Sequence, residues 1–129
     1  MITIFTGIFL FMSSLNPHGN MEDQLERKMT YGKAQPITHL IRNYTVTLNL
    51  LQERGHYTAE EAKPILDSFF NEYPPESCPI QDNGTYNNQK EWFEGTYKTE
   101  AGNTFDAYFE ATFHPDEGHH HLSLIRVKK

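Results

Sequence analysis

Histidines gather near the C-terminal end of the chain in a pattern that could bind a metal ion. His114 precedes a Pro-Asp-Glu-Gly turn, and His119 and His121 follow that turn. Residues two apart on a strand project from the same face, so His119 and His121 can act together, and a hairpin brings His114 beside them. The pattern predicts a candidate divalent metal site of His114, His119 and His121. Exposed histidine-rich turns without a physiological ion are the alternative, and no supporting partner for the imidazoles is evident in the sequence.

A candidate pocket for a small molecule is formed by aromatic side chains and one arginine: Tyr97, Phe105, Phe109, Phe113 and Arg126. Tyr97 would supply a hydrogen-bond donor, and Arg126 would bind an anionic group within an otherwise apolar wall. The alternative is that the aromatic rings fill this space and that Arg126 pairs with an acidic side chain.

An enzyme of the isomerase or dehydratase type would need a carboxylate or an imidazole aimed into the same pocket. The strand pattern places Glu94, Asp106 and Glu110 on the opposite face, and it places His120 only near the rim. A general base is therefore missing from the predicted pocket, so binding is favoured over catalysis.

The opposite face of the same strands carries a predicted interface. Trp92, Tyr108 and Ile125 would lie together there, with Thr112 and Val127 beside them. Exposed aromatic side chains in one patch are typical of a contact surface, so the pattern predicts a homodimer. The alternative is that the N-terminal segment covers this patch.

The composition narrows the class of partner. A chain of 129 residues predicts one domain, and its net charge of −6 argues against nucleic acid or an anionic membrane surface as the main partner. Cys78 is the one cysteine, which excludes an intramolecular disulfide and a cysteine-based metal centre. We expect the partner to be a small molecule or a protein, and we expect no cofactor.

Three C-terminal strands, over residues 91–99, 104–114 and 119–128, must position these side chains. A three-residue loop at 101–103 places Phe93 and Tyr97 on the apolar face of the middle strand, whereas a two- or four-residue loop would bury Glu94 and Lys98 at high cost. The turn at 115–118 then brings His114 opposite His119. This register puts Leu122, Leu124 and Arg126 on the buried face and His119, His121, Ser123, Ile125 and Val127 on the outer face.

The stretch from Arg42 to Tyr73 predicts the centre of the fold. Residues 45–50 alternate as a half-buried strand, and a polar turn leads to a short returning strand. Thr58 and Glu61 then have the spacing of a capping box. The helix that follows has an apolar stripe, and Pro64 predicts a kink or a late start: Ala62, Ile65, Leu66, Phe69 and Phe70 form the stripe. Two shorter helices are predicted over 21–30 and 36–43, and a strand over 76–88 with a turn or bulge at Asn83-Gly84.

Residues 1–20 form a separate segment. The apolar run from Ile2 to Met12 is too short to span a bilayer but suits the core of a secretory signal. No Lys or Arg precedes the run and no small-x-small cleavage motif follows it, so a buried N-terminal segment is the alternative. We expect a single exported domain over 21–129, periplasmic or secreted if the signal is real and otherwise cytoplasmic.

Three stretches carry a family resemblance: VTLNLLQERGHYTAEEAKPILDSFFNEYPP, GTYKTEAGNTFDAYFEATF and LSLIRVKK. Over about Gly32 to Lys129 the chain resembles the nuclear-transport-factor-2-like superfamily, the cone-shaped fold of ketosteroid isomerase and many binding domains. It looks most similar to the bacterial family called domain of unknown function 4783, from which Pro64 and the histidine-rich turn depart. The resemblance implies an exported domain in which a curved antiparallel sheet packs on a long helix, with two N-terminal helices. It supplies no reaction, and members of the superfamily often dimerise through the outer face.

Together these features predict an α+β, cone-like, non-enzymatic domain for binding or interaction. The alternative is a small enzyme that acts on an apolar substrate inside the cone.

Overall fold

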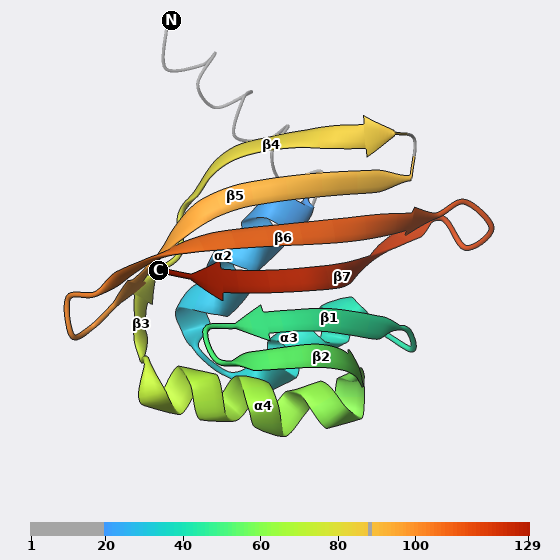
Figure 1. Ribbon diagram of the computed structural model, residues 1–129. Coiled ribbons are helices and arrows are strands. Elements are labelled where there is room, and N and C mark those ends of the chain that lie inside the picture. Colours follow the sequence, from blue (N-terminus) through green and yellow to red (C-terminus); the bar gives the residue numbers. More distant parts are fainter. Residues whose placement is uncertain (1–19, 88) are drawn as a thin grey trace, which may run out of the picture.

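The computed structural model describes residues 20–87 and 89–129. In this part of the chain, helices and strands follow one another in the predicted order (Figure 1). The helices are α2 (Met21–Tyr31), α3 (Ala34–Ile41) and α4 (Ala59–Glu72). The strands are β1 (Thr45–Leu50), β2 (Glu53–Thr58), β3 (Pro75–Ser77), β4 (Ile80–Asn87), β5 (Lys90–Thr99), β6 (Thr104–His114) and β7 (His119–Lys128).

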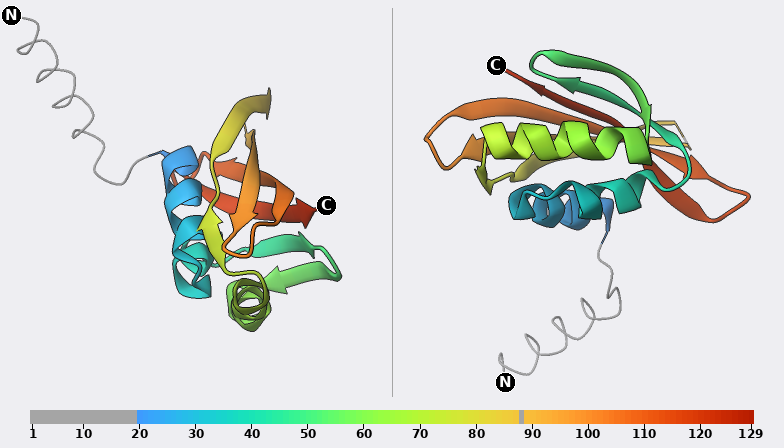
Figure 2. Two further views of the ribbon diagram at one scale, coloured as in Figure 1. Left: turned by 90° about the vertical axis from the view of Figure 1, so that its left-hand side faces the viewer. Right: turned by 90° about the horizontal axis from the view of Figure 1, so that it is seen from below.

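The strands form one curved sheet, in the order β2-β1-β7-β6-β5-β3, with β4 also paired to β5. Figure 2 shows the sheet bending around the side on which α2 and α3 lie, with α4 near the β1–β2 hairpin. The α+β cone with a curved sheet is therefore confirmed. The prediction of a wholly antiparallel sheet is wrong in one place, because β1 and β7 run parallel. A β1–β7 pair joins strands far apart in the sequence, which local patterns do not reveal.

α2 and α4 begin directly after residues whose side chains cap them. The Asn20 side chain accepts a hydrogen bond from the Asp23 N–H at 2.8 Å, and Gly32 ends α2 with a left-handed φ of 75°. Thr58 and Glu61 form both hydrogen bonds of the predicted capping box at the start of α4. Pro64 lies inside α4 without ending it, and the helix starts directly after its cap. The local signals thus fix where α4 starts.

The predicted register of β5 and β6 is confirmed. Tyr97 lies opposite Phe105, Gly95 opposite Ala107 and Phe93 opposite Phe109. All of these residues are buried against the helices, while Glu94 and Lys98 are exposed. The cost of burying charge therefore selected the three-residue loop correctly.

The predicted register of β7 is wrong beyond Ser123. Leu122 lies opposite Ala111, but Leu124 lies opposite Glu110, so β7 has one additional residue at this point. A β-bulge of this kind reverses the faces of all later residues. Ile125 and Val127 are consequently buried, and Leu124 and Arg126 lie on the outer face. The bulge moves Arg126 out of the hydrophobic core and buries the β-branched side chains of Ile125 and Val127 in its place.

The stretch predicted as one strand over 76–88 forms two strands. β3 pairs with the end of β5 at Lys98 and Thr99, whereas β4 pairs with β5 between Lys90 and Gly95. The chain crosses over at Pro79, whose carbonyl accepts a hydrogen bond from the Thr96 N–H at 3.1 Å. A Cβ atom on Gly95 would lie 2.3 Å from the Pro79 oxygen, so this close approach requires glycine. The predicted turn or bulge at Asn83-Gly84 is wrong, because both residues are regularly paired within β4 and its register shifts lie on either side of them.

One hydrophobic core lies between the sheet and the helices. Leu25 and Met29 of α2, Ile37 and Ile41 of α3, and the α4 stripe pack against the buried face of the sheet. No helix in the described part of the chain has the length and apolar character needed to cross a membrane.

Candidate functional site

The predicted pocket residues Tyr97, Phe105 and Phe109 are packed inside the core. Their exposed fractions are 0%, 7% and 0%. The Tyr97 ring lies 5.3 Å from the Phe69 ring of α4, and the Phe105 ring lies 5.4 Å from that of Tyr73. Aromatic pairs at these distances fill the space that a ligand would need. We call the end of the sheet at the β5–β6 loop, around Tyr97 and Phe105, the narrow end of the cone. This end is filled, as the alternative interpretation expected.

The Tyr97 hydroxyl is also occupied. It donates a hydrogen bond to the Tyr73 carbonyl at 2.6 Å, where α4 ends. Burial raises the pKa of Tyr97 well above its ordinary value, so the phenol stays protonated and keeps donating. Tyr97 thus fastens the end of α4 to the sheet, and its donor is not available to a ligand.

Arg126 points to the other face of the sheet. Its guanidinium lies over the Tyr108 ring at 4.5 Å, and its Nε is buried without a hydrogen-bond partner among the described residues. The predicted pocket therefore lacks its charged group, because the β7 bulge turned Arg126 outwards. The same bulge removes Ile125 from the predicted interface, since Ile125 is fully buried.

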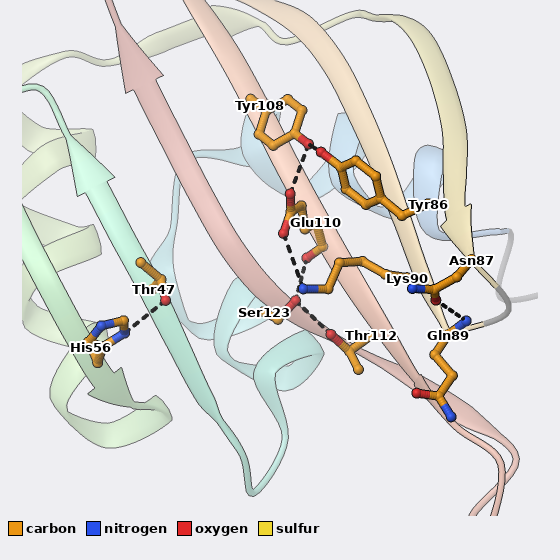
Figure 3. A network of polar contacts seen from close by, with 10 residues as sticks. All are labelled: Thr47, His56, Tyr86, Asn87, Gln89, Lys90, Tyr108, Glu110, Thr112 and Ser123. Carbon is orange, nitrogen blue, oxygen red and sulfur yellow. Dashed lines mark hydrogen bonds and ion pairs between the residues drawn. The ribbon is translucent and has the colours of Figure 1, made fainter.

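The outer face around Tyr108 is a polar network rather than an apolar patch. The Tyr108 hydroxyl donates to Glu110 at 2.8 Å and also shares a hydrogen bond with the Tyr86 hydroxyl, and Lys90 lies 3.7 Å from Glu110 (Figure 3). Trp92, on the neighbouring strand, lies opposite Glu110. Tyr108 and Trp92 are half-buried. The polar side chains around them interrupt the apolar surface.

We call the end of the sheet at the β6–β7 hairpin, around Glu91 and His120, the wide end of the cone. A cavity of about 380 Å³ lies there. It is lined by the start of α2, the end of α3 and the helix-facing side of the sheet, and it is open to solvent. Its lining combines apolar and charged side chains: Met21, Leu40 and Phe93, together with Glu22, Arg42, Glu91 and His120. The wide end therefore contains the space that the narrow end lacks.

Glu91 and His120 form an ion pair in this cavity. The His120 Nε2 lies 2.9 Å from the Glu91 Oε1, and each side chain is 35% exposed. Strand parity explains their position, because Glu91 lies opposite Ala111 and His120 opposite Phe113, on the buried side. The His120 ring lies 4.9 Å from the Phe113 ring. A carboxylate that holds an imidazole can orient it for hydrogen bonding or for proton transfer.

Arg42 completes the charged side of the cavity. Its Nε donates a hydrogen bond to the His120 carbonyl at 3.2 Å. Arg42 follows α3 with a φ of 61°, where its backbone N–H bonds the Thr38 carbonyl. A guanidinium carries five N–H donors, and among the described residues this one uses only its Nε–H in a hydrogen bond.

Sequence reasoning missed Glu91, although the signal was present. The confirmed register places Phe93, Gly95 and Tyr97 inwards, and the same alternation, continued two residues towards the N-terminus, places Glu91 inwards. His120 was expected near the rim, and the structure places it in the cavity wall. Arg42 had no such signal, because it follows a helix end rather than lying on a strand.

The predicted metal ligands His114, His119 and His121 lie close together. The His114 Nε2 and His121 Nδ1 are 2.5 Å apart, and the Tyr44 ring stacks on both imidazoles. Burial, with the neighbouring His114 and His119 imidazoles, lowers the pKa of His121 to about 4. The structure thus brings the histidines together on the outer side of the hairpin, separate from the inward His120.

A group of carboxylates on α2 has a structural explanation. Among the described residues, ligand atoms of Glu22, Asp23 and Glu26 lie within 4.8 Å of one another. Glu26 accepts a hydrogen bond from the Ile80 N–H at 3.0 Å, and Glu22 accepts one from the Asn83 amide at 2.5 Å. These carboxylates connect α2 to β4.

A family model for a domain of unknown function (DUF4783) matches residues 23–112. The chain belongs to the DUF4783 family. Among curated proteins, none matches it significantly. The predicted resemblance to this family is therefore confirmed.

Solved structures of DUF4783 proteins share the fold at low sequence identity. A protein from Bacteroides uniformis is 16% identical with a TM-score of 0.74, and covers 85% of this chain and 97% of its own. A protein from Bacteroides fragilis is 15% identical with a TM-score of 0.72, and covers 85% of this chain and 100% of its own. A designed protein of the nuclear-transport-factor-2-like fold is 11% identical with a TM-score of 0.62, and covers 88% of this chain and 98% of its own. These likenesses support the cone fold and carry no information on activity.

Proposed function

We propose that this DUF4783 protein is a binding domain that holds a small anionic molecule in the cavity at the wide end of the cone. The observation that carries the proposal is the Glu91–His120 pair, which faces a cavity of about 380 Å³ from an otherwise apolar side of the sheet. Ligand cavities typically have about 300–1,000 Å³ and a few converging polar groups among apolar ones.

The charges in the cavity define the class of ligand. Arg42 offers the free donors of a guanidinium, which suit a carboxylate or phosphate group. Glu22 and Glu91 provide acceptors that suit hydroxyl or amino groups on the same molecule. Met21, Leu40 and Phe93 provide an apolar surface. A small carboxylate that also carries hydroxyl or amino groups matches all of these features.

A second, larger cavity of about 480 Å³ lies between α4 and the β1–β2 hairpin. Its charged side chains are Glu53 and Glu72, both acidic, and Glu53 already accepts a hydrogen bond from the Tyr57 hydroxyl at 2.7 Å. No pair of opposite charges lines this cavity among the described residues. The wide-end cavity is the better candidate for that reason.

Protein-observed ¹H–¹⁵N NMR of the labelled chain, titrated with a library of hydroxy acids, amino acids and sugar acids, tests the proposal. Hits should shift the backbone amide signals of Leu40, Phe93 and His120, and Glu91→Gln or His120→Gln should abolish those shifts. Glu94→Gln is the matched control, because Glu94 lies on the same strand but is exposed on the opposite face. Hits that bind Glu91→Gln as well as the natural protein would overturn the assignment.

An enzymatic role is the second candidate, and the same ion pair favours it. A carboxylate 2.9 Å from an imidazole is an arrangement that can accept and return a proton. If the cavity catalyses proton abstraction, hits incubated with the protein in D₂O should exchange a C–H proton for deuterium. Glu91→Gln should then lower the rate of deuterium exchange by a larger factor than it lowers the affinity. Binding of a hit without any exchange contradicts this candidate.

Export and self-association stay predictions. The signal-like run falls on residues 1–19, outside the described part of the chain. The interface retains Trp92 and Tyr108 but not Ile125, so a homodimer would need a largely polar contact.

A further inference from the structure

The tip of the β6–β7 hairpin gathers nitrogen and carboxylate groups on one side. His114 and His119 are paired across the turn, and His121 follows on the same face. The His114 and His119 rings are 5.9 Å apart, and the His114 and His121 rings are 4.7 Å apart. Glu117 belongs to the same turn, and its Oε1 lies 3.6 Å from the His119 Nε2. Several potential metal ligands therefore share one short segment.

Tyr44 connects this cluster to the rest of the fold. Its ring lies 4.0 Å from that of His114 with an angle of 6° between the planes, and 4.3 Å from that of His121. Its hydroxyl donates a hydrogen bond to Glu117. His121 also forms a hydrogen bond with the backbone of Thr45. Such contacts orient imidazole and carboxylate ligands, and they supply the support that the sequence did not reveal.

One ring nitrogen of His119 makes no hydrogen bond to the described residues. This nitrogen, Nε2, is buried, although the Glu117 carboxylate is near. An imidazole nitrogen without a hydrogen bond has none to break when it turns to a metal ion, and it gains a partner. The ligand atoms of the three histidines do not all lie within 4.8 Å of one another, so metal binding requires the His119 side chain to rotate towards the ion.

We propose that His114, His119 and His121, with Glu117, bind a divalent transition-metal ion of the zinc type. Three imidazoles and one carboxylate form a ligand set that suits tetrahedral Zn²⁺, whereas Mg²⁺ and Ca²⁺ prefer oxygen ligands. On binding, the ion would replace the hydrogen bond between His114 and His121 with two metal–nitrogen bonds. The site is separate from the wide-end cavity, because His120 alone among these histidines faces inwards.

The test is calorimetric titration of the full chain, purified without a histidine tag and treated with EDTA, with ZnCl₂ and separately with MgCl₂. We expect one Zn²⁺ per chain. His119→Gln and Glu117→Gln should each raise the Kd for Zn²⁺ by at least about tenfold, as loss of a ligand or of its support does. Glu117 is exposed in the turn, and His119 is the first residue of β7 with a side chain that is 24% exposed, so both variants should fold. Because His39 is exposed on α3, His39→Gln is the matched control and should leave the Kd unchanged.

Three results would overturn the proposal. The first is the absence of Zn²⁺ binding by the natural chain. The second is an equal Kd in His119→Gln, Glu117→Gln and the natural chain, which would place the ion elsewhere. The third is Mg²⁺ binding that competes with Zn²⁺, which would point to the carboxylates of α2. Imidazole ¹⁵N shifts give a second measurement, since His114, His119 and His121 should move on Zn²⁺ addition while His39 does not.

Discussion

The two ends of the cone are built from the same strands and the same rows of inward-facing residues. One end is filled by packed aromatic side chains, and the other contains a cavity with charged side chains. At the narrow end, Tyr97 packs against Phe69 of α4, and Phe105 packs against Tyr73, which follows α4. At the wide end, Glu91 and His120 face a cavity of about 380 Å³. The helix behind the sheet makes the difference. The end of α4 covers the narrow end, whereas the start of α2 and the end of α3 only border the wide end.

Strand alternation decides which side chains point inwards, but it does not decide whether they meet a packing partner. An inward aromatic side chain with a helix behind it becomes core. An inward carboxylate or imidazole requires a partner and access to water, which the open end provides. Stability should therefore depend on the narrow end, and function on the wide end.

Replacing Tyr97 with alanine should have the largest effect. The substitution removes a fully buried ring and its hydrogen bond to the Tyr73 carbonyl, so we expect the free energy of unfolding to fall by about 3–5 kcal/mol. Urea unfolding measures the change. Phe113→Ala, which removes a half-buried ring at the wide end, is the comparison and should cost clearly less. Equal losses would contradict the division between the two ends.

Acid should weaken the wide end before the narrow end. The pKa of His121 is about 4 in the folded protein and 6.5 ordinarily, so the unfolded chain takes up the proton first as the pH falls. The stabilisation is complete above about pH 6.5 and is lost as the pH falls towards 4, by at most about 3 kcal/mol. Burial is the main cause of the low pKa of His121, His114, His119 and Arg42 add to it, and the hydrogen bond to the Thr45 backbone partly offsets it.

Urea unfolding in EDTA at pH 7, 5.5 and 4.5 measures this loss. Hydrogen exchange at the same pH values should show faster exchange at the β6–β7 tip while the amide of Tyr97 stays protected. A stability that does not change between pH 7 and 4.5 would contradict the burial of a neutral His121.

Tyr97→Phe should have an intermediate effect. The ring stays in place, but the Tyr73 carbonyl loses its hydrogen bond at the end of α4, so we expect a loss of about 1 kcal/mol. Comparison of this variant with Tyr97→Ala separates the hydrogen bond from the packing. A loss as large as that of Tyr97→Ala would show that packing contributes little at the narrow end.

Glu91→Gln should change stability least. Its ion pair with His120 is partly exposed, and such pairs contribute about 0–1 kcal/mol. The same substitution should abolish ligand shifts at the wide end. A loss above that range would indicate that the pair serves the fold rather than a ligand.

Much of the fold could be predicted from the sequence because the decisive signals are local. Thr58 and Glu61 set the start of α4, and the charges of Glu94 and Lys98 set the register of β5 against β6. The same reasoning, applied to β7, would have questioned an inward Arg126, since burying its guanidinium is as costly as burying Lys98. The bulge at Ser123 itself has no residue signature, so its position could not be predicted.

The sequence by itself determined the start of α4, the β1–β2 hairpin and the inward rows of β5 and β6, because capping and alternation depend on neighbouring residues. Only the tertiary structure decided the parallel β1–β7 pair, the outward turn of Arg126 and the approach of Arg42 to His120. Each of these joins residues distant in the chain, and its free energy depends on how whole elements pack. That packing fills one end of the cone with aromatic rings and leaves the other end open around Glu91 and His120.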